Sequence, residues 1–255
     1  MLEKWFGLSG KAALVVGVGG LGKEIAVALA HAGADVACSD LFEQKVDETV
    51  AAVRSAGRRS LAIHADVTQE EDVKKIRAAA VKEFGRIDIL VYTVGILRSK
   101  PTLDLNLKEW QLGIDINLTG AFLVCREVGK IMKEKGGGRI ILIGSAFGDR
   151  ILPIVLPYTV SKGGVLQMVH NLAFEWARYG IRVNGIAPGY FNTEMPGEAL
   201  SDPASKAGIL KRIPLRRVGE PHEIGPLAVY LASSASDYMT GEVIRIDGGQ
   251  SYFTV

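Results

Sequence analysis

Short, almost wholly apolar runs alternate with longer amphipathic segments along most of this chain. The runs cover residues 12–16, 36–38, 61–63, 87–91, 140–143, 181–183 and 243–246. Strands buried on both faces have this composition, and parallel sheets covered by helices produce such strands. Between the runs, apolar residues recur at helical spacing, as at Leu21, Ile25 and Leu29. The alternation predicts a single doubly wound α/β domain of the Rossmann type, with a central parallel sheet of about seven strands and helices on both faces.

The chain length and the distribution of proline and glycine indicate the domain organisation. A chain of 255 residues suits one α/β domain, and neither a linker nor an internal repeat divides it. We therefore expect a single domain spanning residues 1–255. Proline and glycine are dense over residues 190–220, which predicts a long loop carrying one short helix. Such a segment is typical of a substrate lid or of a mobile surface loop, and we expect the lid.

Charge and composition argue against several classes of function. The 30 basic and 28 acidic side chains leave a net charge of +2, which gives no electrostatic reason to expect nucleic acid or an anionic membrane as a partner. No apolar run approaches the ~20 residues of a membrane span, and residues 1–6 do not resemble a signal peptide. The four histidines and two cysteines show no metal-ligand spacing. We expect a cytoplasmic protein with two buried, free thiols and no metal.

A glycine-rich turn follows the first apolar run. Residues 17–22 have the sequence Gly-Val-Gly-Gly-Leu-Gly, with G-x-G-x-x-G spacing at Gly17, Gly19 and Gly22. A pyrophosphate group must approach backbone N–H groups at the start of a helix, and a Cβ there would block it. The motif alone is weak, but the apolar run before it and the amphipathic segment after it are the context that a dinucleotide-binding turn needs.

An acidic residue further along supports the same interpretation. Asp40 lies close after the second apolar run, about 20 residues beyond the turn, where a carboxylate accepts hydrogen bonds from the adenosine ribose. It would repel the additional phosphate of NADP, and Leu41 and Phe42 supply no arginine to bind that phosphate. The sequence therefore predicts NAD in preference to NADP. Considered alone, Asp40 would more simply be an exposed turn residue.

A tyrosine and a lysine supply a candidate acid–base pair. Tyr158 and Lys162 are four residues apart and share one face of an expected helix, and Pro157 suits its first turn. A phenol has a pKa of about 10, and an ammonium beside it lowers that value towards the neutral range. Ser145 ends a buried run, at the strand end where open α/β sheets bind ligands. These residues predict acid–base chemistry on a hydroxyl or carbonyl oxygen.

Taken in order, these motifs resemble the short-chain dehydrogenase/reductase family over residues 11–249. The further matching features are Ala65-Asp66-Val67, Asn117, Asn184, Pro188-Gly189, Thr193, residues 217–221 and residues 246–249. Ser145 precedes Tyr158 by 13 residues, as it does in relatives. The resemblance implies an oxidoreductase that transfers a hydride between a nicotinamide cofactor and a small alcohol or carbonyl compound.

The resemblance also implies roles for single residues. Tyr158 would donate or accept the proton, Lys162 would lower its pKa and bind the nicotinamide ribose, and Ser145 would orient the substrate oxygen. Asn117 would hold a water molecule that relays protons from Lys162, with a structural role as the alternative. Thr193 would contact the cofactor or be an ordinary loop residue. The residues expected to contact the cofactor are Gly17, Gly19, Gly20, Leu21, Gly22, Asp40, Asp66, Val67, Gly95, Tyr158, Lys162, Pro188, Gly189 and Thr193.

Two segments depart from the family pattern. The glycine turn is one residue shorter than T-G-x-x-x-G-x-G, and Val16 replaces its threonine, so contacts to the pyrophosphate are expected to shift by a residue. Relatives carry N-N-A-G after the fourth strand, where this chain has residues Tyr-Thr-Val-Gly at 92–95. We expect Thr93 to keep part of the hydrogen bonding of the missing asparagine. Both changes favour an unusual cofactor affinity.

The sequence constrains the substrate less. Family members that open similarly include gluconate 5-dehydrogenase-like enzymes and 3-oxoacyl-carrier-protein reductases, so we expect a polyol, a sugar acid or another secondary alcohol. Arg98, Lys100 and Arg150 would suit an anionic or polyhydroxy substrate, although solvated surface positions are the simpler interpretation. The apolar residues between 147 and 156 either line a pocket or pack at a subunit contact.

Assembly and two other functions complete the expectations. The family favours a homotetramer, and Gly163 and Gly164 would permit a close backbone approach there, since each glycine costs about 1 kcal/mol of helix stability. An enoyl-type reductase or dehydratase is one alternative, which the four-residue spacing of tyrosine and lysine disfavours. A non-catalytic NAD-binding sensor is the other, and it gives no reason to keep the complete catalytic set.

Overall fold

Seven parallel strands form one sheet within residues 2–195 and 197–252, the part of the chain that the computed structural model describes. The strands are β1 Ala12–Val16, β2 Asp35–Asp40, β3 Ser60–His64, β4 Ile89–Tyr92, β5 Gly138–Ile143, β6 Ile181–Pro188 and β7 Val243–Ile246. Each apolar run overlaps one of them. The spatial order is β3-β2-β1-β4-β5-β6-β7, so the winding direction reverses between β1 and β4. The predicted doubly wound fold is confirmed.

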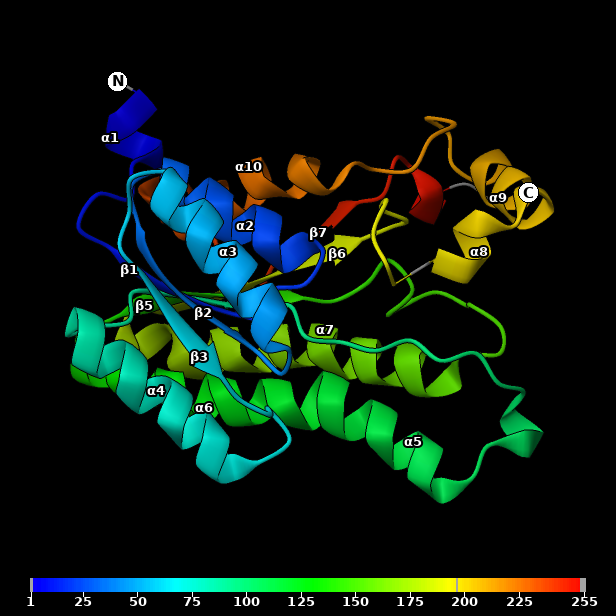
Figure 1. The fold of residues 1–255 in the computed structure, drawn as a ribbon, viewed down its shortest axis with the longest axis horizontal. Helices are drawn as coiled ribbons and strands as arrows, with labels where there is room; N and C mark the ends of the chain where they lie inside the picture. Colours follow the sequence, from blue (N-terminus) through cyan, green and yellow to red (C-terminus); the bar gives the residue numbers. More distant parts are fainter. Residues whose placement is uncertain (1, 196, 253–255) are drawn as a thin grey trace.

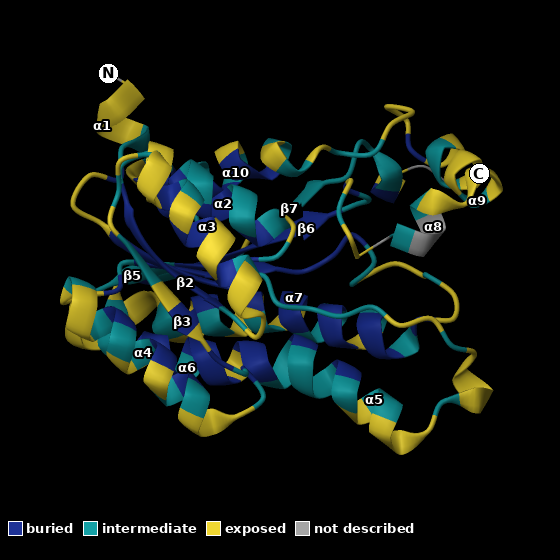
Figure 2. Cartoon of the chain, in the orientation of Figure 1, coloured by how far each residue is buried: buried dark blue, intermediate teal, exposed yellow. Residues whose placement is uncertain are grey.

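Helices cover both faces of the sheet (Figure 1). One layer contains α2 Leu21–His31, α3 Glu43–Ser55 and α10 Gly225–Ala232, and the other contains α4 Glu70–Phe84, α6 Gly120–Glu134 and α7 Leu156–Trp176. Side chains alternate along β1, so that Val15 packs in the core beneath α2 and Leu14 in the core beneath α6. This explains why β1 is apolar at every position, and Figure 2 shows the central strands of the sheet largely in the buried colour.

The remaining elements are short. They are α1 Leu2–Phe6, α5 Leu107–Ile114, α8 Gly197–Ser201, α9 Pro203–Lys211, a π-helical turn Asp115–Thr119, and 3-10 turns at Thr102–Asp104, Ala177–Tyr179, Pro221–Ile224, Ser234–Ser236 and Gln250–Tyr252. Local sequence sets several boundaries. Asn106 and Glu109 form a capping box that starts α5, and Gly85, with φ 74°, ends α4.

The segment 190–220, which we call the lid segment, holds two helices rather than the one predicted. Asp202 accepts a hydrogen bond from Ser205 N at 2.7 Å and Pro203 occupies the first turn, so α9 begins immediately after α8 ends. Pro196 lies outside the described residues. The two ends of the segment are joined, because Gly219 donates to Tyr190 O and accepts from Asn192 N, both at 2.9 Å. Both ends of the lid segment therefore lie next to each other, just after the end of β6.

The strand ends determine where a ligand can bind. In Figure 1 the carboxyl ends of the strands point toward the side of the molecule that carries α8 and α9. Open α/β sheets bind ligands at these ends, beside the switch in winding direction. Cys38 and Cys125 are buried and free, as predicted. Among the described helices, none is long and apolar enough to cross a membrane, and no cluster of three or more His, Cys, Asp or Glu in the described part could hold a metal ion.

Candidate active site

The glycine turn lies at the switch point, between the end of β1 and the start of α2. Gly17 and Gly20 have φ angles of 91° and 51°, a region that side chains disfavour. A Cβ on Gly22 would stand 1.8 Å from the carbonyl oxygen of Gly17. No side chain caps the N-terminus of α2, where Gly22 N–H donates to Gly19 O at 3.1 Å, so this helix end can receive an anion. The turn therefore fits the pyrophosphate of a dinucleotide.

Thr93 holds this turn from beneath. Its hydroxyl donates to the carbonyl oxygen of Gly17, and its backbone N–H donates to Val16 O at 2.8 Å. The same hydroxyl oxygen would lie only 2.6 Å from a Cβ on Gly17 and 2.8 Å from one on Gly22. The expectation that Thr93 provides hydrogen bonds in place of the missing asparagine agrees with these contacts, which join the end of β4 to the turn.

Asp40 is the last residue of β2 and lies next to the glycine turn. Its Oδ2 accepts from Val18 N at 2.9 Å and its Oδ1 accepts from Phe42 N at 3.1 Å. A carboxylate has further lone pairs, so ribose hydroxyls can still bind it. Leu41 and Phe42 are exposed beside it, and neither carries a charge. This arrangement fits a ribose without a phosphate.

Asp66 and Val67 follow β3 but face different surroundings. Asp66 Oδ1 accepts from the N–H and the hydroxyl of Thr68, at 2.9 and 2.8 Å, in a turn that precedes α4. Val67 is buried, and its side chain packs where a Cβ on Gly120 would stand. Both side chains thus have structural contacts, so an adenine contact would involve mainly the backbone between them.

The three central catalytic candidates come together beyond the ends of β4 and β5. Tyr158 and Lys162 lie on the first turns of α7, and Ser145 follows β5. All three are buried, and the hydroxyl groups of Tyr158 and Ser145 are hydrogen-bonded. Lys162 Nζ donates to Ile143 O at 2.9 Å and to Val94 O at 3.4 Å. The structure thus brings the hydroxyl groups of Tyr158 and Ser145 into contact and holds the Lys162 ammonium at the end of β5.

The electrostatics of this group differ from the prediction. Burial raises the pKa of Tyr158, the hydrogen bond with Ser145 opposes that effect, and the nearby Tyr190 adds to it. Burial lowers the pKa of Lys162 from 10.5 to about 8. The expected lowering of the Tyr158 pKa by Lys162 is thus wrong for the protein alone. Desolvation dominates because both side chains are buried and the hydrogen bonds of the ammonium go to backbone carbonyls.

Asn117 lies in the π-helical turn and is fully buried. Its Nδ2 donates to Ile96 O at 3.0 Å and to Ser161 Oγ at 2.9 Å, while its Oδ1 accepts from Ile96 N at 2.8 Å. These bonds fix the segment after β4 against α7. They match the structural alternative for Asn117, and they also place it near Lys162, because a Cβ on Gly95 would lie within 4 Å of both side chains.

The remaining predicted residues surround the same strand ends. Gly95 leaves room for Lys162 Nζ, which would stand 3.0 Å from a Cβ there. Pro188 O accepts from Ala146 N at 2.9 Å, and Gly189 N donates to Ile246 O at 3.0 Å, so β5, β6 and β7 are joined at their ends. Thr193 touches the glycine turn, since its side chain is 3.4 Å from a Cβ on Gly20. The lid segment therefore begins against the predicted phosphate site.

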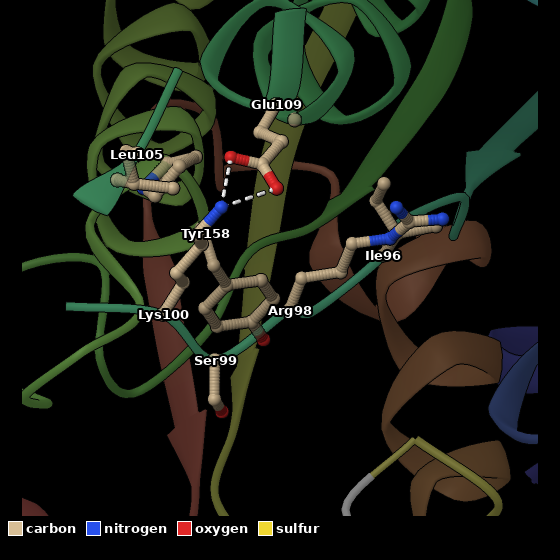
Figure 3. Close-up of a pocket in the computed structure, with 9 residues that line it drawn as sticks. Ile96, Arg98, Ser99, Lys100, Leu105, Glu109 and Tyr158 are labelled. Atoms are coloured by element: carbon tan, nitrogen blue, oxygen red, sulfur yellow. Dashed lines mark hydrogen bonds and ion pairs between the residues drawn. The ribbon is translucent and has the colours of Figure 1, made fainter. Parts of the chain in front are cut away.

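A cavity of about 130 Å³ opens beside Tyr158. It is lined by Ile96, Arg98, Ser99, Lys100, Leu105, Glu109, Gly113, Pro157 and Tyr158. Lys100 Nζ binds both carboxylate oxygens of Glu109 at 2.7 Å, whereas the Arg98 side chain extends away from that pair (Figure 3). Arg98 is exposed, in line with the solvated-surface interpretation, and Lys100 is half-buried, but both side chains also line this cavity beside Tyr158. Arg150 is exposed and is not part of the cavity wall.

Some functional candidates were not found in the sequence. Tyr190 packs edge-on against Phe147 at 5.5 Å between ring centroids and affects the pKa of Tyr158. Glu109 neutralises Lys100, and Lys45 lies over Gly19. Nothing in the sequence pattern pointed to Tyr190 or Glu109. Lys45 lies in the first turn of a helix after the predicted ribose-binding strand, a position that could have drawn attention.

Contacts within the chain explain why glycine occupies positions 163 and 164. A Cβ on Gly163 would stand 2.7 Å from Gly148 O, and one on Gly164 would stand 2.7 Å from the Leu118 side chain. The predicted close backbone approach is therefore present at Gly163, whereas Gly164 makes room for a side chain. Both contacts lie inside one protomer, so these glycines do not argue for a tetramer.

Comparisons with known proteins agree with this architecture. A family model described as enoyl-(acyl carrier protein) reductase matches residues 17–251. The 2-dehydro-3-deoxy-D-gluconate 5-dehydrogenase of Dickeya dadantii (strain 3937) is 39% identical and is covered over 98% of both chains. The crystal structure of a gluconate 5-dehydrogenase from Burkholderia cenocepacia J2315, in complex with NADP and tartrate, is 34% identical, with a TM-score of 0.95 and coverage of 100% of both chains. A short-chain type dehydrogenase/reductase from Mycobacterium marinum is 38% identical, with a TM-score of 0.92 and coverage of 98% of both chains.

Proposed function

Because this chain belongs to the short-chain dehydrogenase/reductase family of oxidoreductases, we propose that it interconverts a secondary alcohol and a ketone on a sugar acid. The observation that carries the proposal is the position of Tyr158, whose side chain lines a cavity shared with Arg98. A phenol and a guanidinium beside one small cavity suit a polyhydroxy carboxylate. The relatives from Dickeya dadantii and Burkholderia cenocepacia have names that support this substrate class.

We assign the chemistry to the residues at the strand ends. Ser145 donates a hydrogen bond to the substrate oxygen, and Tyr158 passes a proton to that oxygen in reduction or removes one in oxidation. Since burial raises the pKa of Tyr158, the phenol is protonated at neutral pH and ready for reduction. Asn117 and Lys162 form a route by which the phenol regains its proton. A bound nicotinamide dinucleotide would supply or accept the hydride, and its oxidised form would add a positive charge that favours the phenolate form of Tyr158.

We propose NAD as the preferred cofactor. The glycine turn and the N-terminus of α2 would hold the pyrophosphate, and Asp40 would accept hydrogen bonds from the adenosine ribose. Asp66, Val67, Gly95, Pro188, Gly189 and Thr193 would complete the contacts. The Burkholderia cenocepacia structure contains NADP, so the preference rests on Asp40 and on the uncharged Leu41 and Phe42 beside it.

Arg98 is the proposed anchor for the substrate carboxylate. Lys100 forms an ion pair with Glu109, whereas Arg98 has no carboxylate within ion-pair distance among the described residues and interacts with Glu109 only from farther away. A guanidinium binds a carboxylate through two parallel hydrogen bonds. We expect Arg98→Met to raise KM for sugar acids about 10-fold and to leave KM for uncharged polyols nearly unchanged. Arg150→Met changes an exposed arginine outside the cavity and is the matched control. If Arg98→Met changes KM equally for charged and uncharged substrates, Arg98 does not bind the substrate carboxylate.

Tyr158→Phe tests the reaction itself. The substitution removes the ionisable oxygen and keeps the ring, so kcat should fall at least 100-fold while the Kd for NADH stays within about twofold. Absorbance at 340 nm measures turnover with sugar acids, polyols and hydroxysteroids, and fluorescence measures NADH binding. Tyr238→Phe, at a fully exposed tyrosine, is the control. If Tyr158→Phe retains turnover within tenfold, the proposed mechanism is wrong.

The same assay distinguishes the two alternatives. The matching family model is described as an enoyl-(acyl carrier protein) reductase, so an enoyl thioester belongs in the substrate panel. Turnover of that thioester without turnover of any alcohol would favour double-bond reduction. NADH binding without turnover of any substrate would favour a sensor.

We further propose that one domain spans residues 1–255 and that the lid segment covers the bound substrate. We also propose that the protein acts in the cytoplasm.

For the assembly we propose a homotetramer. Phe122 on α6 and Val160 and Phe174 on α7 are exposed apolar residues, and a partner subunit would cover them. Light scattering that gives the mass of a monomer would refute the tetramer.

A further inference from the structure

One lysine connects the glycine turn with the lid segment. Lys45 lies in the first turn of α3, and its side chain extends across Gly19, where Cδ and Nζ would stand 3.2 and 3.3 Å from a Cβ. Gly19 therefore leaves space that the lysine occupies. The ammonium also lies 5.4 Å from the centroid of the Phe42 ring. A cation from α3 is thus held beside a turn that itself contains no charged residue.

The partner of this cation comes from the lid segment. Lys45 Nζ and Glu194 Oε2 are 2.8 Å apart, and Thr193, the residue before Glu194, touches Gly20. Two adjacent lid residues therefore reach the cofactor turn: Thr193 lies against Gly20, and Glu194 pairs with the lysine that extends across Gly19. The Glu194 side chain is 84% exposed and that of Lys45 is 36% exposed. The ion pair is therefore accessible to solvent, and a competing anion can displace the carboxylate.

A dinucleotide would bring such an anion to this place. The pyrophosphate would bind at the N-terminus of α2, directly after Gly20, and the ribose would bind at Asp40, which is hydrogen-bonded to Val18. Gly19 lies between these two points in sequence. A phosphate at either position would approach the Lys45 ammonium, whether it is the pyrophosphate or the additional ribose phosphate of NADP.

We propose that Lys45 is a phosphate-binding residue for the dinucleotide and that Glu194 competes for the same ammonium, so that cofactor binding releases this lid contact. The inference rests on the proposed function only in requiring a nicotinamide dinucleotide. It assigns the lid segment a second role besides covering substrate. Because Glu194 neutralises the ammonium, it also suppresses the attraction of Lys45 for phosphate groups.

Two substitutions separate this proposal from a structural role of the ion pair. Lys45→Met removes the cation, so the Kd for the dinucleotide should rise about 3- to 10-fold. Glu194→Gln frees the cation, so the Kd should fall by about 2- to 5-fold. Both variants lose the lid contact, so trypsin should cut at Lys206 and Lys211 faster in both than in the wild type. Opposite changes in affinity with the same change in proteolysis are the result expected.

The measurements use full-length protein, with NADH and NADPH titrated separately by fluorescence and with Lys75→Met as the control. Lys75 forms an exposed ion pair of equal length, 2.8 Å, with Asp72 on α4. Equal effects of Lys45→Met on both dinucleotides indicate the pyrophosphate, and a larger effect on NADPH indicates the ribose phosphate. Unchanged Kd values in both variants, or a higher Kd in both, would overturn the proposal. A wild type that binds neither dinucleotide would instead refute the proposed function.

Discussion

Lys162 gives the most direct test of the electrostatics of the site. Its side chain is fully buried, its Nζ donates to two backbone carbonyls, and no carboxylate pairs with it within the described residues. Burial lowers its pKa from 10.5 to about 8. Replacing it by methionine, which has a similar length and no charge, removes this titration from the folded and unfolded states. The difference in unfolding free energy between the wild type and Lys162→Met should therefore depend on pH.

The direction follows from proton binding. Below about pH 8 the lysine is charged in both states, so the folded protein carries the full cost of burying the charge. Between about pH 8 and 10.5 the folded state has lost the proton while the unfolded chain keeps it. The unfolded state then binds more protons, so the wild type gains stability relative to the variant as the pH rises. At ~1.36 kcal/mol per pKa unit, the gain is on the order of 3 kcal/mol.

Urea unfolding at intervals from pH 7 to pH 10.5 measures this difference. Tyr158 and other buried groups whose pKa values are raised act in the opposite direction at high pH, but they are present in both proteins and cancel in the comparison. Lys108→Met serves as the control, because an exposed lysine loses little solvation on folding. A difference between wild type and Lys162→Met that stays flat within about 0.5 kcal/mol, or that falls as the pH rises, would refute the reasoning.

Two further predictions concern the predicted cofactor site. Gly22→Ala should weaken NADH binding at least 10-fold and reduce stability by about 2 kcal/mol or more, because its Cβ would stand 1.8 Å from Gly17 O. The control is Gly208→Ala, in an exposed helical position with nothing within 4 Å, which should stabilise the protein slightly. Similar thermal shifts for the two variants would contradict this account. Asp40→Ala should raise the Kd for NADH about 10-fold and reduce the preference for NADH over NADPH, and Asp40→Asn should give intermediate Kd values. Fluorescence titration measures both Kd values. An unchanged ratio between them would show that Asp40 does not bind the ribose.

The fold could be predicted from the sequence because its strongest signals are local and repeated. Each apolar run is short, and the segment after it has helical spacing, so β1 and α2 are recognised without knowledge of any long-range contact. The glycine turn is similarly local, since Gly17 and Gly22 must come together whatever surrounds them. The lid segment is less regular, and its second helix depends on the cap at Asp202, which a count of prolines and glycines does not detect.

The site was only partly predictable, because charge and desolvation depend on contacts between distant residues. Tyr158 and Lys162 are correctly placed on one helical face, but the effect of one on the other is set by Ile143 O and Val94 O, which hold the ammonium, and by burial. Arg98 and Lys100 have similar local sequence surroundings. Glu109, from α5, forms an ion pair with Lys100 and interacts more weakly with Arg98, which is why we propose Arg98 as the cation that binds a substrate. Under the proposed function, substrate preference would thus depend on which of these two cations pairs with Glu109. That pairing is set by the packing of α5 and cannot be read from the local sequence around Arg98 and Lys100.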